Sequence, residues 1–401
     1  MNKNHELLQT KWDYCYTVRR PRFQKSTCYL FVTFFVILNL FIDLRKKCNN
    51  FNSLQKKVLK KIDNDHAINK KTKKQQKRES LIINQTIENP YHIFRFWNKS
   101  FPCYHQAQRA SINKTNREGI LYVKLHKAAS STLAGVAMQI GANHKHPDMH
   151  NHQRCHVQAK HKSAIELGVS NRIRDKSYLW TFVRDPKERA LSSYFYFQAT
   201  RQQENPTGSK ILKNLQQVNN YQTNYIRTKE SFNYSSTENI DKLSLSLLKE
   251  YDFVGLVEYL DESLVVLRLL LGLDPKDIIY LPAKQMGSYM VLNPNECARI
   301  YPKYTTPKVE KYLASDAWKE KNKMDYALVE AAKRSLQATI QSIGQRRFLE
   351  AFHLHERLLA EARKKCMQNG TYPCSEEGER QNDTCYWNDI GCGHDCIAKN
   401  L

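Results

Sequence analysis

The chain has 401 residues, of which 41% are hydrophobic and 11% aromatic, so it can form a large core and is not wholly disordered. It carries 63 Lys and Arg against 39 Asp and Glu, a formal net charge of +24. This excess indicates an anionic partner: nucleic acid, anionic lipid, acidic glycan or a phosphorylated nucleotide. The excess is uneven, because residues 1–80 carry 19 basic and 6 acidic side chains and the remainder 44 and 33.

An apolar stretch near the N-terminus is typical of a membrane anchor. No charged residue occurs from Cys28 to Ile42, and a helix over residues 26–44 would span roughly 28 Å, close to one bilayer core. A cleaved signal peptide is the alternative, but no small-x-small cleavage site follows. A buried soluble helix fits less well, since the stretch has no polar face. Basic residues flank both ends, so charge alone does not set the orientation.

The cysteines and the sequons indicate that the body of the chain lies in an oxidising lumen. Of the eight cysteines beyond residue 100, five lie in the last 36 residues, where little apolar core is present. Six N-x-[ST] sequons all follow the apolar stretch, beginning at Asn84, Asn98, Asn113, Asn233, Asn369 and Asn382. We expect disulfides whose pairing the sequence does not select. A zinc site is the alternative, although no CxxC pair occurs.

These features predict a type II membrane protein. Residues 1–25 would be a cytosolic tail, 26–44 a signal anchor, 45–117 a basic luminal stem, 118–365 the catalytic domain and 366–401 a disulfide-rich tail. A nuclear signal is the rival interpretation of the ten basic residues between Lys56 and Arg78, but the preceding anchor disfavours it. Nucleic acid is disfavoured as a partner for the same reason.

The segment Gly119 to Gly141, GILYVKLHKAASSTLAGVAMQIG, predicts a strand, a tight turn and a helix. Ser130 or Ser131 is the expected N-cap. Such a unit points backbone N–H groups and a helix dipole at one spot, where a phosphate binds well. Lys127 adds a positive charge. An ordinary strand–helix connection is the alternative, and the missing glycines exclude a Walker A loop.

The segment Ser177 to Phe197, SYLWTFVRDPKERALSSYFYF, predicts a buried strand followed by a helix. Asp185 is a good N-cap and Pro186 suits the first helical position. Arg184 therefore lies at the carboxyl end of a strand, where α/β sheets bind ligands. Ser192 follows two helical turns later. The alternative is a surface Arg–Asp pair with a solvated serine.

Together, KAASST and FVRDPKERALSSY make the chain resemble the Golgi carbohydrate sulfotransferases, a group that includes heparan and uronyl 2-O-sulfotransferases and galactose 3-O-sulfotransferases. The resemblance implies a donor, 3′-phosphoadenosine 5′-phosphosulfate (PAPS), and a glycan acceptor, which we expect to be acidic, with no metal. It assigns the 5′-phosphosulfate to the loop Lys127, Ala128, Ala129, Ser130, Ser131 and Thr132. It assigns the 3′-phosphate to Arg184 and Ser192.

Weaker similarities extend the resemblance over about residues 118 to 340. NNYQTNYI (Asn219 to Ile226) is similar to a segment near the acceptor and cofactor. YDFVGLVEYLDESLVVL (Tyr251 to Leu267) is similar to a strand–helix element in which Asp261 is the expected N-cap. Asn322, Asp325 and Leu328 follow the pattern of a late helix.

The resemblance also implies a histidine base between the two motifs, where an imidazole suits proton transfer near neutral pH. Six histidines lie there: His144, His146, His150, His152, His156 and His161. We expect His156, with His152 second, and Lys127 as a further catalytic group. Surface histidines, or a metal-binding tract with Cys155, are the alternatives.

The expected fold is α/β, a P-loop-like sulfotransferase fold with a central parallel sheet flanked by helices, and residues 325–365 should be helical. The expected function is PAPS-dependent sulfuryl transfer to a glycan or glycoconjugate hydroxyl in the Golgi lumen. Two alternatives stay open: a non-catalytic, membrane-anchored glycan-binding protein on the same fold, and a P-loop nucleotide phosphotransferase. Lys145, Lys160, Lys162, Lys303 and Lys308 are expected near the cleft mouth, where a solvated basic surface would explain them equally well.

Overall fold

A computed structural model describes the compact unit Asn84–Leu401 in part. It describes residues 91–103, 117–144, 155, 157–158, 160–229, 240–281, 289–293, 296–366, 374–375, 377–381 and 393–401. The predicted cytosolic tail and anchor lie outside the described residues. Within these ranges, no helix combines the length and apolar composition that a bilayer crossing requires.

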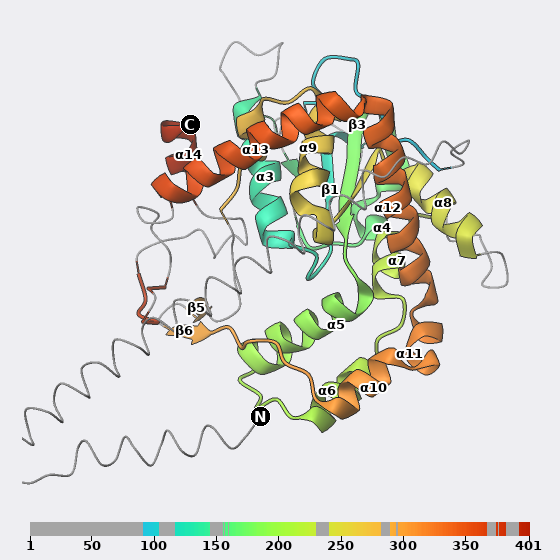
Figure 1. Cartoon of the computed structure of the whole chain (residues 1–401), viewed down its shortest axis with the longest axis vertical. Helices are drawn as coiled ribbons and strands as arrows, with labels where there is room; N and C mark the ends of the chain where they lie inside the picture. The colour runs from blue at the N-terminus through green and yellow to red at the C-terminus, as the bar shows by residue number, and fades with distance from the viewer. Residues whose placement is uncertain are drawn as a thin grey trace, which may run out of the picture. The chain divides into compact units, whose positions relative to one another are not determined.

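The described domain is built on a parallel sheet of four strands, in the order β2-β1-β3-β4 (Figure 1). The strands are β1 (Arg117–Val123), β2 (Val157–Gln158), β3 (Arg172–Val183) and β4 (Phe253–Leu256). Every neighbouring pair is parallel, which confirms the expected α/β class. A separate antiparallel hairpin joins β5 (Tyr289–Asn293) to β6 (Glu296–Arg299).

The register brings the carboxyl ends of β1 and β3 together. Val123, the last residue of β1, pairs with Thr181 of β3. The buried Thr181 hydroxyl donates a hydrogen bond of 2.8 Å to the Val123 carbonyl, which fixes the two strands against each other. Because both strands run in the same direction, the turns that follow them leave the sheet at one edge.

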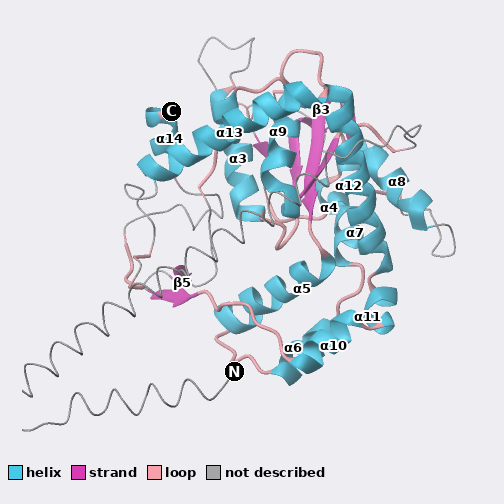
Figure 2. Ribbon diagram, in the orientation of Figure 1, coloured by secondary structure: helices cyan, strands magenta, loops and turns pink. Residues whose placement is uncertain are grey.

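Helices surround this sheet (Figure 2). They are α3 (Ser130–Asn143), α4 (Ala164–Leu167), α5 (Pro186–Tyr194), α6 (Gly208–Leu215), α7 (Tyr221–Ile226), α8 (Ile240–Glu250), α9 (Leu260–Leu271), α10 (Pro307–Ala314), α11 (Asp316–Lys321), α12 (Lys323–Ile343), α13 (Gln345–Cys366) and α14 (His394–Asn400). A π-helix over Phe195–Arg201 continues α5, and 3₁₀ turns occur at Val169–Asn171, Val257–Tyr259 and Pro275–Ile278. Helices α12 and α13 confirm the expected helical region at residues 325–365.

Aromatic side chains fill the centre of the domain. Tyr122 of β1 stacks on Trp180 of β3 with ring centroids 4.3 Å apart, and both are fully buried. Phe182 and Phe253 continue this layer with an edge-on contact of 5.9 Å. A second cluster around Trp318 packs α5, α6 and α10 together beyond the carboxyl edge of the sheet. The carboxyl edge of the sheet therefore lies between two packed cores (Figure 1).

Two sequence-based expectations need correction. Residues 91–103, expected in the stem, pack on the domain: Phe94 is 1% exposed, and its N–H donates to the Thr339 hydroxyl at 3.0 Å. Asp261 is not the N-cap of α9, because that helix begins one residue earlier, at Leu260. The Asp261 carboxylate instead accepts a hydrogen bond of 2.7 Å from the Tyr280 hydroxyl.

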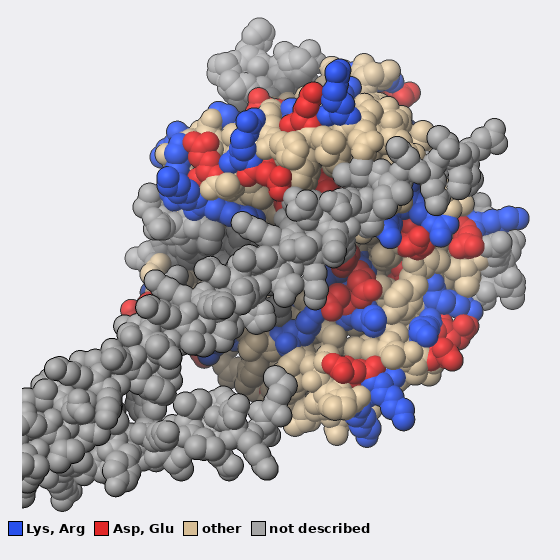
Figure 3. Space-filling view, in the orientation of Figure 1, with Lys and Arg blue, Asp and Glu red and all other residues tan. Residues whose placement is uncertain are grey.

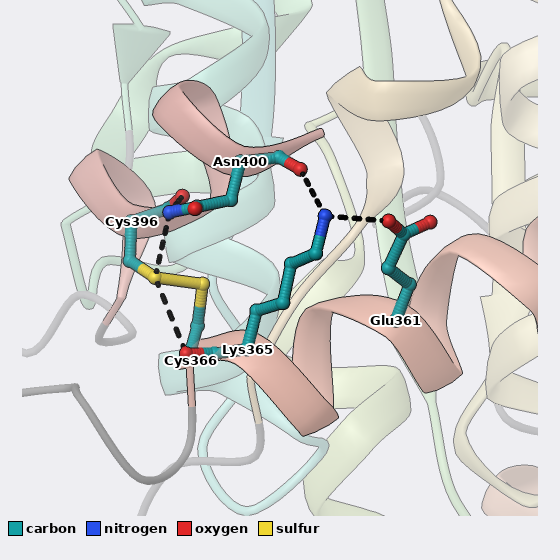
Figure 4. Close-up of a disulfide and its surroundings, with 5 residues drawn as sticks. All are labelled: Glu361, Lys365, Cys366, Cys396 and Asn400. Carbon is teal, nitrogen blue, oxygen red and sulfur yellow. Dashed lines mark hydrogen bonds and ion pairs between the residues drawn. A yellow bond between two sulfur atoms is a disulfide. The ribbon is translucent and has the colours of Figure 1, made fainter.

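Three disulfides confirm the expected cross-linking. They join Cys103 to Cys155, Cys297 to Cys374 and Cys366 to Cys396. The last one ties α14 to the end of α13, and Figure 4 shows the Lys365 ammonium beside it, bonded to Glu361 at 2.6 Å and to the Asn400 carbonyl at 3.0 Å. Cys385 and Cys392 lie outside the described residues.

The change Cys396→Ser tests the contribution of this bridge. The bridge closes a loop of 30 residues, so its loss should lower the free energy of unfolding by about 3–4 kcal/mol through chain entropy. Denaturant titration of the full chain without reductant measures the change. Lys365→Ala is the matched control: it removes the neighbouring half-exposed ion pair to Glu361 and the hydrogen bond to the Asn400 carbonyl but leaves the bridge, and it should cost about 1 kcal/mol or less. An equal loss in both variants would contradict this account.

Candidate active site

The turn between β1 and α3 has an unusual backbone. Lys127 and Ala129 adopt positive φ angles of 64° and 54° although neither is glycine. Alternation between left-handed and ordinary conformations turns successive N–H groups toward one side and forms an anion-binding concavity. The left-handed residues each cost free energy, and such strain is concentrated at functional sites.

The expected serine cap of α3 is wrong. The N-cap is Ala129, whose side chain has no acceptor, and the helix begins at Ser130. The two serines therefore lie within the first turn instead of capping it. Without a side-chain cap, the N–H groups at the start of α3 suit an external acceptor. Both serines are half-buried, whereas Ala128 and Thr132 are buried.

The Lys127 ammonium lies over the face of Tyr196, 3.6 Å from the ring centroid. Such a cation–π contact fixes the direction of a flexible lysine side chain. Tyr196 belongs to the π-helix that continues α5, and π-helical turns occur frequently at functional sites. The first motif is thus in contact with the helix of the second.

The second motif folds as predicted. Asp185 is the N-cap of α5, its carboxylate accepts the Glu188 N–H at 3.0 Å, and Pro186 begins the helix. Arg184 is the first residue after β3 and lies at the carboxyl edge of the sheet. Ser192 lies two turns along α5 and is half-buried.

The Arg184 side chain reaches the first motif directly. Its Nη1 donates to the Lys127 carbonyl oxygen at 3.2 Å, and Nη2 lies 3.4 Å from Glu188 Oε2. Its Nε is buried and has no hydrogen-bond partner among the described residues. The two predicted anion-binding turns are therefore adjacent, and a guanidinium donor remains for a further acceptor.

Two carboxylates accompany this guanidinium. Glu188 also pairs with the Lys303 ammonium. Glu258 Oε1 lies 4.0 Å from Arg184 Nε and accepts the Asp185 N–H at 3.1 Å. Burial is the main cause that raises the pKa of Glu258 above its ordinary value. The raised pKa reflects the cost of removing the Glu258 carboxylate from water.

Arg189 is a basic residue of this region that the sequence analysis did not single out. It is 2% exposed, and its guanidinium carbon lies 4.2 Å above the Tyr221 ring. Desolvation by burial lowers its pKa from the ordinary value. The second arginine of RDPKER was the available signal. A second guanidinium is thus buried on α5, the helix that follows Arg184.

Of the six candidate histidines, the structure describes two. His144, at the end of α3, bonds to Asp277 at 3.1 Å, roughly 20 Å along the helix from Ser130. His161 Nδ1 instead contacts the Lys124 carbonyl at 3.0 Å, immediately after β1. Strand β2 runs parallel to β1, so the chain that follows β2 leads to the same edge. The expected bases His156 and His152, and also His146 and His150, lie outside the described residues.

An aromatic cluster adjoins the lysine turn. His126, beside Lys127, stacks on His161 with ring centroids 3.9 Å apart. Phe197 and Tyr225 contact His126 edge-on at 5.8 and 5.6 Å. The cluster holds two imidazoles next to the lysine turn, and it combines residues from α7 and the π-helix that lie far apart in sequence.

The lysines expected at the cleft mouth have different environments. Lys303 is paired with Glu188, whereas Lys160, Lys162 and Lys308 are exposed. Lys145 lies outside the described residues. On the face shown in Figure 3, basic side chains are interspersed with acidic ones. The net charge of the domain is therefore not gathered into one basic surface on this face.

A parallel α/β sheet with a lysine turn and an arginine turn in contact at its carboxyl edge is an arrangement typical of proteins that bind phosphorylated ligands. The profile of the sulfotransferase family matches residues 111–325, more than half of the chain. The chain belongs to this family, and the resemblance to carbohydrate sulfotransferases is confirmed.

Two curated proteins are also similar to this chain. Galactosylceramide sulfotransferase of Mus musculus is 26% identical over 210 residues, a match that covers 41% of this chain and 48% of the mouse protein. Galactosylceramide sulfotransferase of Homo sapiens is 26% identical over 201 residues, with the same two coverages of 41% and 48%. The match thus spans about half the length of each relative.

The strained turn makes a stability prediction. Ala129→Gly should leave the free energy of unfolding unchanged or raise it by about 1 kcal/mol, since glycine adopts positive φ without steric cost. Ala128→Gly is the matched control: Ala128 is fully buried and its φ is not positive, so this variant should lose about 1 kcal/mol. Denaturant titration compares the two. Equal losses would show that the turn is not strained at Ala129.

Proposed function

We propose that this protein is a PAPS-dependent sulfotransferase that transfers a sulfuryl group to a hydroxyl of a glycan or glycoconjugate. The observation that carries the proposal is the contact of 3.2 Å between the Arg184 guanidinium and the Lys127 carbonyl. Because of this contact, the two turns form one basic region. A nucleotide that carries phosphates at both its 5′ and 3′ positions needs two such turns close together.

The residues present fit such a donor. Lys127 and the backbone of the turn through Thr132 would hold the 5′-phosphosulfate. Arg184 and Ser192 would hold the 3′-phosphate, and the Arg184 Nε, which has Glu258 4.0 Å away but no hydrogen-bond partner among the described residues, supplies a donor for it. Charge-assisted hydrogen bonds from arginine to phosphate are short and strong. The donor contributes the sulfuryl group, bonded to an oxygen of its 5′-phosphate.

In the proposed reaction, the acceptor oxygen forms a bond to sulfur while the bond between sulfur and the 5′-phosphate oxygen breaks. Lys127 and the turn N–H groups are fixed before the reaction, so they stabilise negative charge on the departing phosphate without reorganising. The acceptor proton goes to an imidazole. The protein therefore acts mainly by positioning and charge stabilisation.

His161 is our choice of base among the described histidines of the interval. Its contact with the Lys124 carbonyl places it at the sheet edge that carries Lys127, unlike His144. If Nδ1 donates that hydrogen bond, Nε2 is the basic nitrogen of the neutral ring. His156 and His152, the first choices from sequence, stay predictions.

For the acceptor, we propose a galactose-bearing glycoconjugate as the first compound to test, because both curated relatives are named for galactosylceramide. An acidic glycan is the second, since Lys160 and Lys162 are exposed beside His161. We further propose that residues 26–44 anchor the protein in the Golgi membrane with the domain in the lumen. Three disulfides support an oxidising compartment.

Sulfate transfer from PAPS to neutral and acidic glycans tests the proposed function. Lys127→Ala should lower kcat about 100- to 1,000-fold, because it removes a donor at the departing oxygen. Arg184→Ala should raise KM for PAPS about 10- to 100-fold, through loss of charged hydrogen bonds.

Lys364→Ala and Arg346→Ala, on the exposed surface of α13, are the charge-matched controls and should keep wild-type kinetics. The proposal fails if the wild type neither transfers sulfate to any acceptor nor binds 3′,5′-ADP. Glycan binding without transfer would indicate a non-catalytic protein, and magnesium-ATP binding a phosphotransferase.

The choice of His161 as the base leads to a separate prediction. His161→Gln should lower kcat about 100-fold or more while the affinity for 3′,5′-ADP stays within about two-fold, because general-base catalysis acts on the acceptor and not on the nucleotide. His353→Gln, on the exposed face of α13, is the control. Calorimetry and initial rates separate the two effects. Unchanged kcat in His161→Gln would assign the proton to another group.

A further inference from the structure

Helices α7 and α12 cap each other at their N-termini. The side-chain oxygen of Asn220, the N-cap residue of α7, accepts the N–H groups of Met324 and Asp325 at 2.9 and 3.3 Å. In return, the Asp325 carboxylate accepts the N–H groups of Gln222 and Thr223 at 3.1 and 2.8 Å. Two of the orphan N–H groups at the start of each helix are satisfied in this way.

This connection is buried and rigid. Asp325 is 1% exposed, and it also accepts the Thr223 hydroxyl at 2.8 Å. Buried carboxylates with several hydrogen bonds hold their partners in one geometry, because any displacement leaves a desolvated polar group unpaired. The first turn of α7 therefore has a fixed position relative to α12.

From that turn, the Gln222 side chain reaches the main chain of Arg184. Gln222 Oε1 accepts the Arg184 N–H at 2.8 Å, and Gln222 Nε2 donates to the Arg184 carbonyl at 2.7 Å. Gln222 is 0% exposed. One amide side chain thus satisfies both the main-chain N–H and the main-chain carbonyl of Arg184.

These two bonds replace a strand partner that the sheet does not provide. The pairing of β3 with β4 ends at Val183 and Leu256, so Arg184 is the first residue beyond the ladder. Its backbone N–H and carbonyl need partners. Gln222 supplies both, and so sets the direction in which the Arg184 side chain leaves the sheet.

We propose that Gln222 is a positioning residue for recognition of the donor's 3′-phosphate, acting through Arg184 and anchored by Asp325. This inference rests on the proposed function. Gln222 makes no contact with substrate in the proposal; it fixes the peptide from which the guanidinium reaches Lys127. A small displacement of this peptide would move the guanidinium away from the phosphate.

The test compares the affinities of the full chain for 3′,5′-ADP and 5′-AMP, measured by calorimetry in the same buffer. Their ratio reports recognition of the 3′-phosphate alone. Gln222→Met keeps the side-chain length and removes both hydrogen bonds. It should lower the ratio about 10-fold, with the affinity for 5′-AMP kept within about two-fold.

Thr223→Val is the matched control, because it removes one hydrogen bond to Asp325 from the same turn without touching Arg184. It should lower the melting temperature and keep the wild-type ratio. A merely structural role of Gln222 would instead weaken both nucleotides equally, and this result, or an unchanged ratio, would overturn the inference. A wild-type ratio of one would refute the proposed function itself.

Gln222→Asn covers the case in which Gln222→Met does not fold. Its neutral amide is one methylene shorter and cannot reach both the N–H and the carbonyl of Arg184, so the ratio should also fall. An unchanged ratio in this variant would equally overturn the inference.

Discussion

The hydrogen bond from the Arg184 guanidinium to the Lys127 carbonyl is the interaction on which the candidate site depends. It joins two turns that lie 57 residues apart in sequence. The turns meet because β1 and β3 are adjacent parallel strands whose ends are aligned at Val123 and Thr181. Each turn by itself would be an ordinary strand–helix connection. Because the two turns are in contact, a lysine, an arginine and the start of a helix lie together at the carboxyl edge of the sheet.

Neighbouring carboxylates balance part of this positive charge. Glu188 links Arg184 to Lys303, and Glu258 lies near the same guanidinium. Because Glu188 is partly exposed, its pairs with Arg184 and Lys303 contribute modest stability, and an incoming phosphate can replace them at small cost. The backbone of Arg184 is held differently, by the buried amide of Gln222. The side chain is therefore adaptable, whereas the peptide that carries it is fixed.

The sequence predicts the local units of this fold because strand patterns and the Asp185 cap depend on neighbouring residues. It does not predict Ala129 as the N-cap of α3, since a positive φ on alanine leaves no compositional signal. It also misplaces residues 91–103, although Phe94 and Trp97 were unusual for a solvated stem. The pairing of cysteines and the contact between Gln222 and Arg184 depend on tertiary packing, which no local pattern encodes.

Binding of 5′-AMP and 3′-AMP to Lys127→Ala and Arg184→Ala tests the central claim most directly. The main-chain oxygen that holds Arg184 remains in Lys127→Ala, so the two substitutions act separately. The account predicts that Lys127→Ala weakens 5′-AMP about 10-fold or more and spares 3′-AMP, and that Arg184→Ala does the reverse. Equal weakening of both nucleotides by each substitution, or no weakening by either, would contradict it.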